Sequence, residues 1–105
     1  MRDESEIETL ISEIRNFAKA RDWEKFHTPK NLAMAIAGEA GELAAEFQWL
    51  TEEESIIEAL SEQQIRDIRL EIADVQIYLY RLIDVLKINI SDAVREKLEI
   101  NKSRF

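Results

Sequence analysis

Residues 62–87 read EQQIRDIRLEIADVQIYLYRLIDVLK, and this stretch decides the fold class. Its apolar residues recur at spacings of three and four, the period of a helix, along two stripes. The first stripe is Ile65, Ile68, Ile72, Val75, Leu79 and Leu82, and the second is Leu70, Ile77, Tyr80, Ile83 and Leu86. A helix that is apolar on two sides must be covered on both. The sequence therefore predicts an α-helical bundle completed by another copy of the chain, with the second stripe at the interface.

The other helices are predicted from signals at their first residues. Ser or Thr followed three residues later by Glu or Gln forms a reciprocal cap, which satisfies free N–H groups at a helix N-terminus. This pattern occurs at Ser5, Thr51 and Ser61, while Pro29 suits a first helical position and Ser91 with Asp92 gives a further start. Helices are therefore expected at about 5–20, 29–49, 52–59, 62–87 and 91–103.

Length and charge exclude several classes of protein. The chain has 105 residues and a net charge of −8, with only two glycines and one proline, so we expect a single all-α domain over residues 1–105. The negative charge repels DNA, RNA and anionic lipid, so neither a nucleic-acid polymer nor a membrane is expected as a partner. The absence of cysteine excludes disulfides and thiolate metal sites. Because no apolar signal segment opens the sequence, a cytoplasmic location is expected.

Carboxylates interrupt the apolar residues of the two longest predicted helices. Glu39, Glu42 and Glu46 follow one another at spacings of three and four, so they share one face of their helix. Glu71 and Asp74 are three residues apart on the next long helix. A solvated surface is the ordinary explanation of such a row, but solvated rows are usually paired with Lys or Arg. The first of these helices has no basic residue beyond its first turn, so the ordinary pairing is missing.

Converging carboxylates without cations raise one another's pKa unless a metal ion supplies positive charge. Hard oxygen ligands, in a chain with no cysteine and one histidine, suit Mg²⁺, with Mn²⁺ as a possible substitute, rather than Zn²⁺. A di-iron site with Glu-x-x-His motifs is not expected, because the single histidine, His27, lies outside both acidic helices. From this pattern alone, metal binding and a solvated surface both remain open.

Two motifs carry a resemblance to a known family. Gly38-Glu39-Ala40-Gly41-Glu42-Leu43 and Glu71-Ile72-Ala73-Asp74 resemble the E-x-x-E and E-x-x-D motifs of the all-α NTP pyrophosphatases, the MazG-like superfamily. The strings RDWEKFH at 21–27, PKNL at 29–32, EFQW at 46–49 and NKSRF at 101–105 resemble its dCTP pyrophosphatase branch. The resemblance implies a four-helix-bundle-type fold completed by homo-oligomerisation, as a dimer or tetramer.

The resemblance also implies an activity. A nucleoside triphosphate, by preference dCTP or a modified cytidine nucleotide, would be cleaved with Mg²⁺ to the monophosphate and pyrophosphate, in nucleotide-pool sanitation. The alternative is a catalytically inert helical dimer that binds a nucleotide or a protein partner. Unpaired acids favour the enzyme, because an inert relative would have no use for them.

The implied catalytic residues, which would also hold Mg²⁺, are Glu39, Glu42, Glu71 and Asp74. Glu42 or a neighbouring carboxylate would orient the attacking water or take its proton, and Glu46 is a spare acid. Many members of the superfamily carry a further acid where this chain has Gly38, which leaves the number of metal ions open.

The implied substrate-binding residues are Trp23, Glu24, Lys25, Phe26, His27, Trp49 and Tyr78. Trp49 lies two helical turns beyond Glu42 and Tyr78 one turn beyond Asp74, so both are expected on the metal face. Without the resemblance, Trp23 and His27 are better explained as side chains of a connecting loop that cap the core. Weaker candidates for holding the phosphates are Lys97, Asn101, Lys102 and Arg104.

Overall fold

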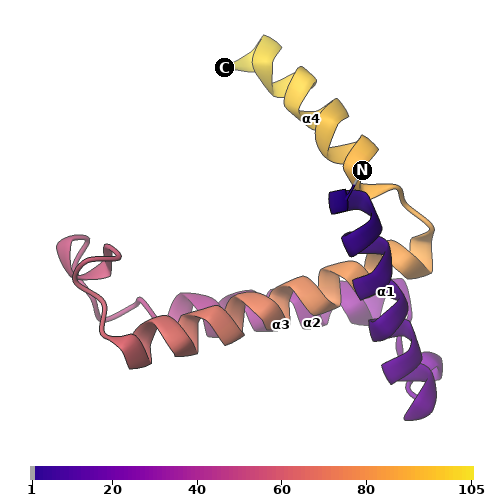
Figure 1. The fold of residues 1–105 in the computed structure, drawn as a ribbon, viewed down its shortest axis with the longest axis horizontal. Coiled ribbons are helices and arrows are strands. Elements are labelled where there is room, and N and C mark those ends of the chain that lie inside the picture. The colour runs from indigo at the N-terminus through magenta and orange to yellow at the C-terminus, as the bar shows by residue number, and fades with distance from the viewer. Residues whose placement is uncertain (1) are drawn as a thin grey trace. The chain divides into compact units, whose positions relative to one another are not determined.

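The computed structural model describes residues 2–105, with side chains from Glu6 onward (Figure 1). Over this range the chain forms helices and no strand, which confirms the all-α class. The helices are α1 (Arg2–Ala20), α2 (Pro29–Ala45), α3 (Glu62–Leu86) and α4 (Ile90–Arg104), with short 3-10 helices η1 (Glu24–Phe26) and η2 (Glu53–Ser55). Association with a second copy stays a prediction.

The chain divides into two compact units. The central unit is Lys30–Leu79 and contains nearly all of α2 and most of α3. The terminal unit combines α1 and η1 with Tyr80–Phe105, that is, with the last residues of α3 and with α4. The expectation of a single domain over residues 1–105 stays a prediction.

Two of the predicted caps are present between α2 and α3. The Thr51 amide donates to Glu54 Oε1 at 2.8 Å, and the Glu54 amide donates back to Thr51 Oγ1 at 3.2 Å. Ser61 and Gln64 exchange the same pair of bonds, at 2.8 and 3.1 Å. These bonds satisfy amides that have no partner inside a helix. The cap predicted at Ser5 falls outside the described side chains, and α1 begins earlier, at Arg2.

The predicted end of the second helix is wrong. Helix α2 ends at Ala45 and not at residue 49. The next two amides, of Glu46 and Phe47, bond to carbonyls three residues back, at 3.1 and 3.0 Å. Such bonds tighten the chain into turns that leave the α-helical path. Helical spacing from Glu39 therefore does not locate residues 46–49.

Two further predicted bounds are corrected. The acidic helix expected at 52–59 is only η2, because the backbone becomes extended at Ile56, where ψ is 155°. Helix α4 begins at Ile90 because Asn89, and not Ser91, is the cap: its Oδ1 accepts from the Asp92 amide at 3.0 Å.

Helices α1 and α3 both end at a left-handed residue that is not glycine. Asp22 and Lys87 each have a φ of 57°. After α1, the Asp22 amide bonds to Lys19 O at 3.1 Å and the Trp23 amide bonds to Ala18 O at 2.9 Å. The amides of Lys87 and Ile88 form the corresponding pair after α3. This is the Schellman termination, and after α1 it sets the direction of the loop that leads to His27.

Few apolar side chains are buried. Among the described residues, the buried hydrophobic ones are Ala18, Leu32, Ile68 and Ile83. The two predicted stripes of α3 are not divided as expected, because Ile83 of the second stripe is buried and Ile72 of the first is 50% exposed. Elsewhere in the second stripe, Leu70 and Ile77 are exposed. Over the part of the chain that the structure describes, no helix is long and apolar enough to cross a bilayer.

Candidate metal and nucleotide site

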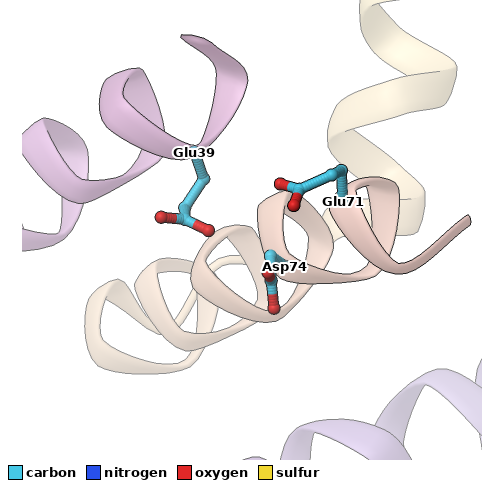
Figure 2. A group of neighbouring side chains, drawn as sticks. All are labelled: Glu39, Glu71 and Asp74. Carbon is cyan, nitrogen blue, oxygen red and sulfur yellow. The ribbon is translucent and has the colours of Figure 1, made fainter. Parts of the chain in front are cut away.

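Helices α2 and α3 bring three carboxylates together in the central unit (Figure 2). Glu39 reaches from α2 toward Glu71 and Asp74, which lie one turn apart on α3. One oxygen of each lies within 4.8 Å of the others, a spacing at which one cation can take an oxygen from each residue. Glu42, the fourth predicted ligand, is exposed and lies outside this group of described residues.

Glu71 occupies the least favourable electrostatic environment of this group. Its Oε2 is buried and has no hydrogen-bond partner among the described residues. Burial raises the pKa of Glu71, and the negative charges of Asp74, Glu42, Glu46 and Glu39 raise it further. Because buried polar atoms nearly always have a partner, this carboxylate fits a site that receives a cation.

The two aromatics predicted beside the acids lie in the same unit. Tyr78 is half-buried and follows Asp74 by one turn of α3. Trp49 is 87% exposed and lies beyond the end of α2. The two-turn helical spacing from Glu42 does not apply to Trp49, because the helix ends before it, so its position on the metal face stays a prediction. Its role in substrate binding stays a prediction.

The aromatic loop at residues 23–27 belongs to the terminal unit. Trp23 stands edge-on to Phe17, with ring centroids 5.6 Å apart, and edge-on to His27 at 6.4 Å. Trp23 is 43% exposed and Phe26 is 59% exposed. Both rings are therefore accessible, and their role in substrate binding stays a prediction.

The polar residues of this loop lie on its outside. Glu24 and Lys25 are exposed. The Lys25 ammonium pairs with Asp22 at 3.0 Å and lies 5.3 Å from the centre of the Phe26 ring. Lys25 is thus held close to an aromatic face that a base could also stack upon.

His27 is held by a buried arginine. Its Nδ1 accepts a hydrogen bond from Nε of Arg81 at 3.0 Å, and Nη1 of Arg81 donates to Oδ2 of Asp84 at 3.0 Å. Arg15 donates to both oxygens of Asp84 at 2.8 Å. Burial lowers the pKa of His27, the charge of Arg81 lowers it further, and Glu24 opposes the change.

The four weaker candidates lie on α4, in the terminal unit. Lys97 is exposed, and the ammonium of Lys102 pairs with Glu99 at 2.9 Å. The carbonyl of Asn101 accepts from the Phe105 amide at 2.8 Å, and the Arg104 guanidinium lies 5.1 Å from the Phe105 ring. A pocket of about 290 Å³ also lies in this unit, but none of the described residues lining it is a predicted site residue.

Similarity to known proteins shows which family this chain belongs to. No protein-family model matches the sequence. The curated protein dCTP pyrophosphatase 1 of Homo sapiens is 39% identical over 102 residues, and that of Bos taurus is 38% identical over the same length. Each match covers 93% of this chain and 60% of the relative, so the chain spans about three-fifths of their length.

A solved structure matches over almost its full length. The crystal structure of a pyrophosphatase from Archaeoglobus fulgidus DSM 4304 is 42% identical, with a TM-score of 0.86, and the match covers 95% of this chain and 92% of that one. This chain belongs to the MazG-like all-α pyrophosphatases, and its similarity to the two dCTP pyrophosphatases extends over 93% of its own length. The resemblance of its motifs is thereby confirmed, while the role of each site residue stays a prediction.

The sequence alone did not indicate that Arg15, Arg81 and Asp84 hold the predicted site residue His27. The available signal was the presence of two charges, Arg81 and Asp84, three residues apart in an otherwise apolar stretch of α3. That spacing predicts an ion pair on one helix. It does not predict the bond to His27, which lies 54 residues away in the sequence.

Proposed function

We propose that this chain is a Mg²⁺-dependent nucleoside triphosphate pyrophosphohydrolase. Its substrate would be dCTP or a modified cytidine nucleotide, and its products the monophosphate and pyrophosphate. The convergence of Glu39, Glu71 and Asp74 in a member of this family carries the proposal. The relatives named dCTP pyrophosphatase 1 support the choice of nucleotide. Nucleotide-pool sanitation in the cytoplasm would be the role.

The carboxylate group fits Mg²⁺ by its chemistry. All three candidate ligands offer oxygen, and the buried Oε2 of Glu71 is an acceptor without a partner among the described residues. Hard oxygen ligands suit Mg²⁺ and also Mn²⁺. When bound, Mg²⁺ would neutralise phosphate oxygens and polarise the reacting phosphorus.

The acids divide into two roles by their position. Glu39, Glu71 and Asp74 converge closely enough to hold one cation together. Glu42 follows Glu39 by three residues on α2 and is exposed, so its carboxylate is available to orient a water or to accept its proton. Glu46, beyond the end of α2, remains the spare acid.

The nucleoside would be bound by aromatic groups. Stacking on an aromatic side chain contributes about 1–3 kcal/mol per base. In the central unit the exposed ring of Trp49, with Tyr78, is a suitable partner for a base or sugar. In the terminal unit the exposed ring of Trp23, with His27, is a second candidate for such contacts. Lys97, Asn101, Lys102 and Arg104 remain weaker candidates for the phosphates.

We also infer that the chain acts as a homo-oligomer, a dimer or tetramer. Helix α3 exposes Leu70 by 53%, Ile72 by 50% and Leu86 by 47%. Large apolar side chains exposed on more than one side of a helix favour cover by a partner, and we propose that the partner is a second copy of the chain.

A panel of nucleoside triphosphates tests the proposal. With Mg²⁺ present, we expect dCTP or its modified forms to be turned over faster than the other nucleotides. Glu71→Gln should abolish turnover, and Glu58→Gln, which changes an exposed Glu outside the group, should not. If no nucleotide is turned over while nucleotides still bind, the protein is instead an inert helical binder.

A further inference from the structure

Four residues of the terminal unit form one connected hydrogen-bond chain. Arg15 of α1 donates hydrogen bonds to both carboxylate oxygens of Asp84. Asp84 also accepts a hydrogen bond from Arg81, and Arg81 donates another to Nδ1 of His27. Arg81 is 6% exposed and is the buried charged residue of the described chain. Because each link uses a directional donor and acceptor, the chain fixes both the position of the imidazole and its orientation.

This geometry decides where the proton of His27 lies. A guanidinium N–H donates and cannot accept, so Nδ1 must present its lone pair to Arg81. The neutral ring therefore carries its proton on Nε2. An imidazolium, or the opposite neutral tautomer, would set an N–H of the ring against the N–H of Arg81.

The net charge around His27 also disfavours a protonated ring. Arg81 and Arg15 carry two positive charges and Asp84 one negative charge, so the network as a whole opposes a further positive charge on the ring. Glu24 of η1 is the facing acid that partly offsets it. The other neighbour, Trp23, is uncharged and stands edge-on to the ring.

We propose that Arg81, held by Asp84 and Arg15, is a positioning residue that keeps His27 as the neutral Nε2–H tautomer. Nε2 has no hydrogen-bond partner among the described residues, so it is free to donate. On the proposed function, on which this last step rests, that donor meets an uncharged acceptor of the nucleoside, such as the carbonyl or ring nitrogen of a pyrimidine. A neutral ring is not suited to neutralising a phosphate.

The proposal can be tested without substrate because the chain has a single histidine. Protein labelled with ¹⁵N-histidine gives one pair of imidazole nitrogen signals. At neutral pH we expect Nδ1 to have the chemical shift of an unprotonated nitrogen and Nε2 that of a protonated one, with a pKa for His27 below 6.5. The opposite tautomer, an average of the two, or a pKa at or above 6.5 would overturn the proposal.

Two variants separate positioning from folding. Arg81→Met should let the two tautomers mix and should raise the pKa of His27, and Asp84→Asn should do the same to a smaller degree. Arg69→Met removes an exposed arginine from the same helix and should leave both nitrogen signals unchanged. If Arg81→Met does not fold, the wild-type spectrum and Asp84→Asn still decide the outcome. An unchanged tautomer in a folded Arg81→Met overturns the proposal.

Kinetics connect the tautomer to the substrate. Loss of one well-placed hydrogen bond should raise the KM of Arg81→Met for its nucleotide by about three- to tenfold, with kcat nearly unchanged. The KM of this variant should also vary with pH near 6.5, whereas that of the wild type should not. An inactive wild type contradicts the proposed function but leaves the spectrum decisive, and the wrong tautomer in an active enzyme overturns only this inference.

Discussion

Glu71 is an acid whose surroundings disfavour its charge. Its Oε2 is buried without a partner among the described residues, and burial together with four neighbouring acids raises its pKa. Without a cation, such a residue destabilises the fold in its charged form. A bound cation removes that cost, so stability and metal binding should be linked at this position.

Mg²⁺ should therefore stabilise the wild-type protein and should not stabilise Glu71→Gln. A ligand present at 100 times its dissociation constant adds about 2.7 kcal/mol to the free energy of unfolding. Glu71→Gln should also lower turnover by at least about 100-fold, because even residues that only support metal ligands cost 10- to 100-fold. Thermal unfolding with and without Mg²⁺ measures the first effect. An equal Mg²⁺ shift in both proteins would rule out Glu71 as a ligand.

Asp84 and His27 predict the response of the terminal unit to acid. The hydrogen bonds from Arg15, helped by the charges of Arg15 and Arg81, lower the pKa of Asp84 against the effect of burial. Stability from Asp84 is thus complete above pH 3.8 and is lost as the pH falls through its lower folded value. The pKa of His27 is also lowered, so the unfolded chain takes up that proton first, and stability already declines below pH 6.5.

Urea unfolding at a series of pH values measures both steps. In a Glu71→Gln background, which lacks the opposing titration of Glu71, we expect the midpoint to fall between about pH 7 and pH 5 and again below about pH 4. Asp84→Asn should lose the lower step and His27→Gln the upper one. A midpoint that rises on acidification, or variants that keep both steps, would show that these residues do not control the response.

Helix boundaries show which elements could be predicted from sequence. The caps at Thr51 and Ser61 were predicted correctly because each is a bond between residues three apart. The end of α2 at Ala45 was not, since no glycine or proline marks the point where the amides turn to carbonyls three residues back. Asn89 was missed because two capping residues, Asn89 and Ser91, lie within one turn and only the geometry selects between them.

In the candidate site, too, some residues could be predicted from the sequence and others could not. Glu39, Glu71 and Asp74 could be predicted together because helical spacing and a family motif both point to them. The network around His27 could not, because its bonds join residues 54 and 69 apart in the sequence. Contacts of this range depend on how the helices pack.

Lys87 offers a test at the end of α3. It occupies the left-handed position of a Schellman termination, where a Cβ is unfavourable and glycine is preferred. Lys87→Gly should therefore raise the free energy of unfolding by about 0.5–1 kcal/mol, after allowance for the flexibility of glycine in the unfolded chain. Lys87→Ala is the matched control, because it removes the same charge and keeps Cβ. Equal urea midpoints for the two variants would contradict this explanation.

The molecule as a whole exposes much apolar surface for a chain of 12.3 kDa. In solution we expect light scattering to give the mass of two or four chains. Ile77→Lys places a charge on an exposed apolar position of α3 and should shift the distribution toward smaller species. Gln63→Lys adds the same charge at an exposed polar position of that helix and should not. A wild-type mass of one chain would exclude the oligomer.

The net charge of −8 affects which partners the whole molecule can bind. It disfavours nucleic-acid polymers, whereas the acids that converge between α2 and α3 suit a cation that could in turn receive a triphosphate. Removal of divalent metal with EDTA should therefore abolish turnover, and added Mg²⁺ should restore it. Full activity in EDTA would show that the carboxylates do not act in the reaction by holding a divalent metal ion.

The phosphorus products of dCTP hydrolysis decide most directly whether the chain is a pyrophosphohydrolase. In ³¹P NMR of the wild-type protein with dCTP and Mg²⁺, we expect dCMP and pyrophosphate to appear in equal amounts and dCDP to be absent. Formation of dCDP with orthophosphate, or no change in dCTP, would contradict the proposed function.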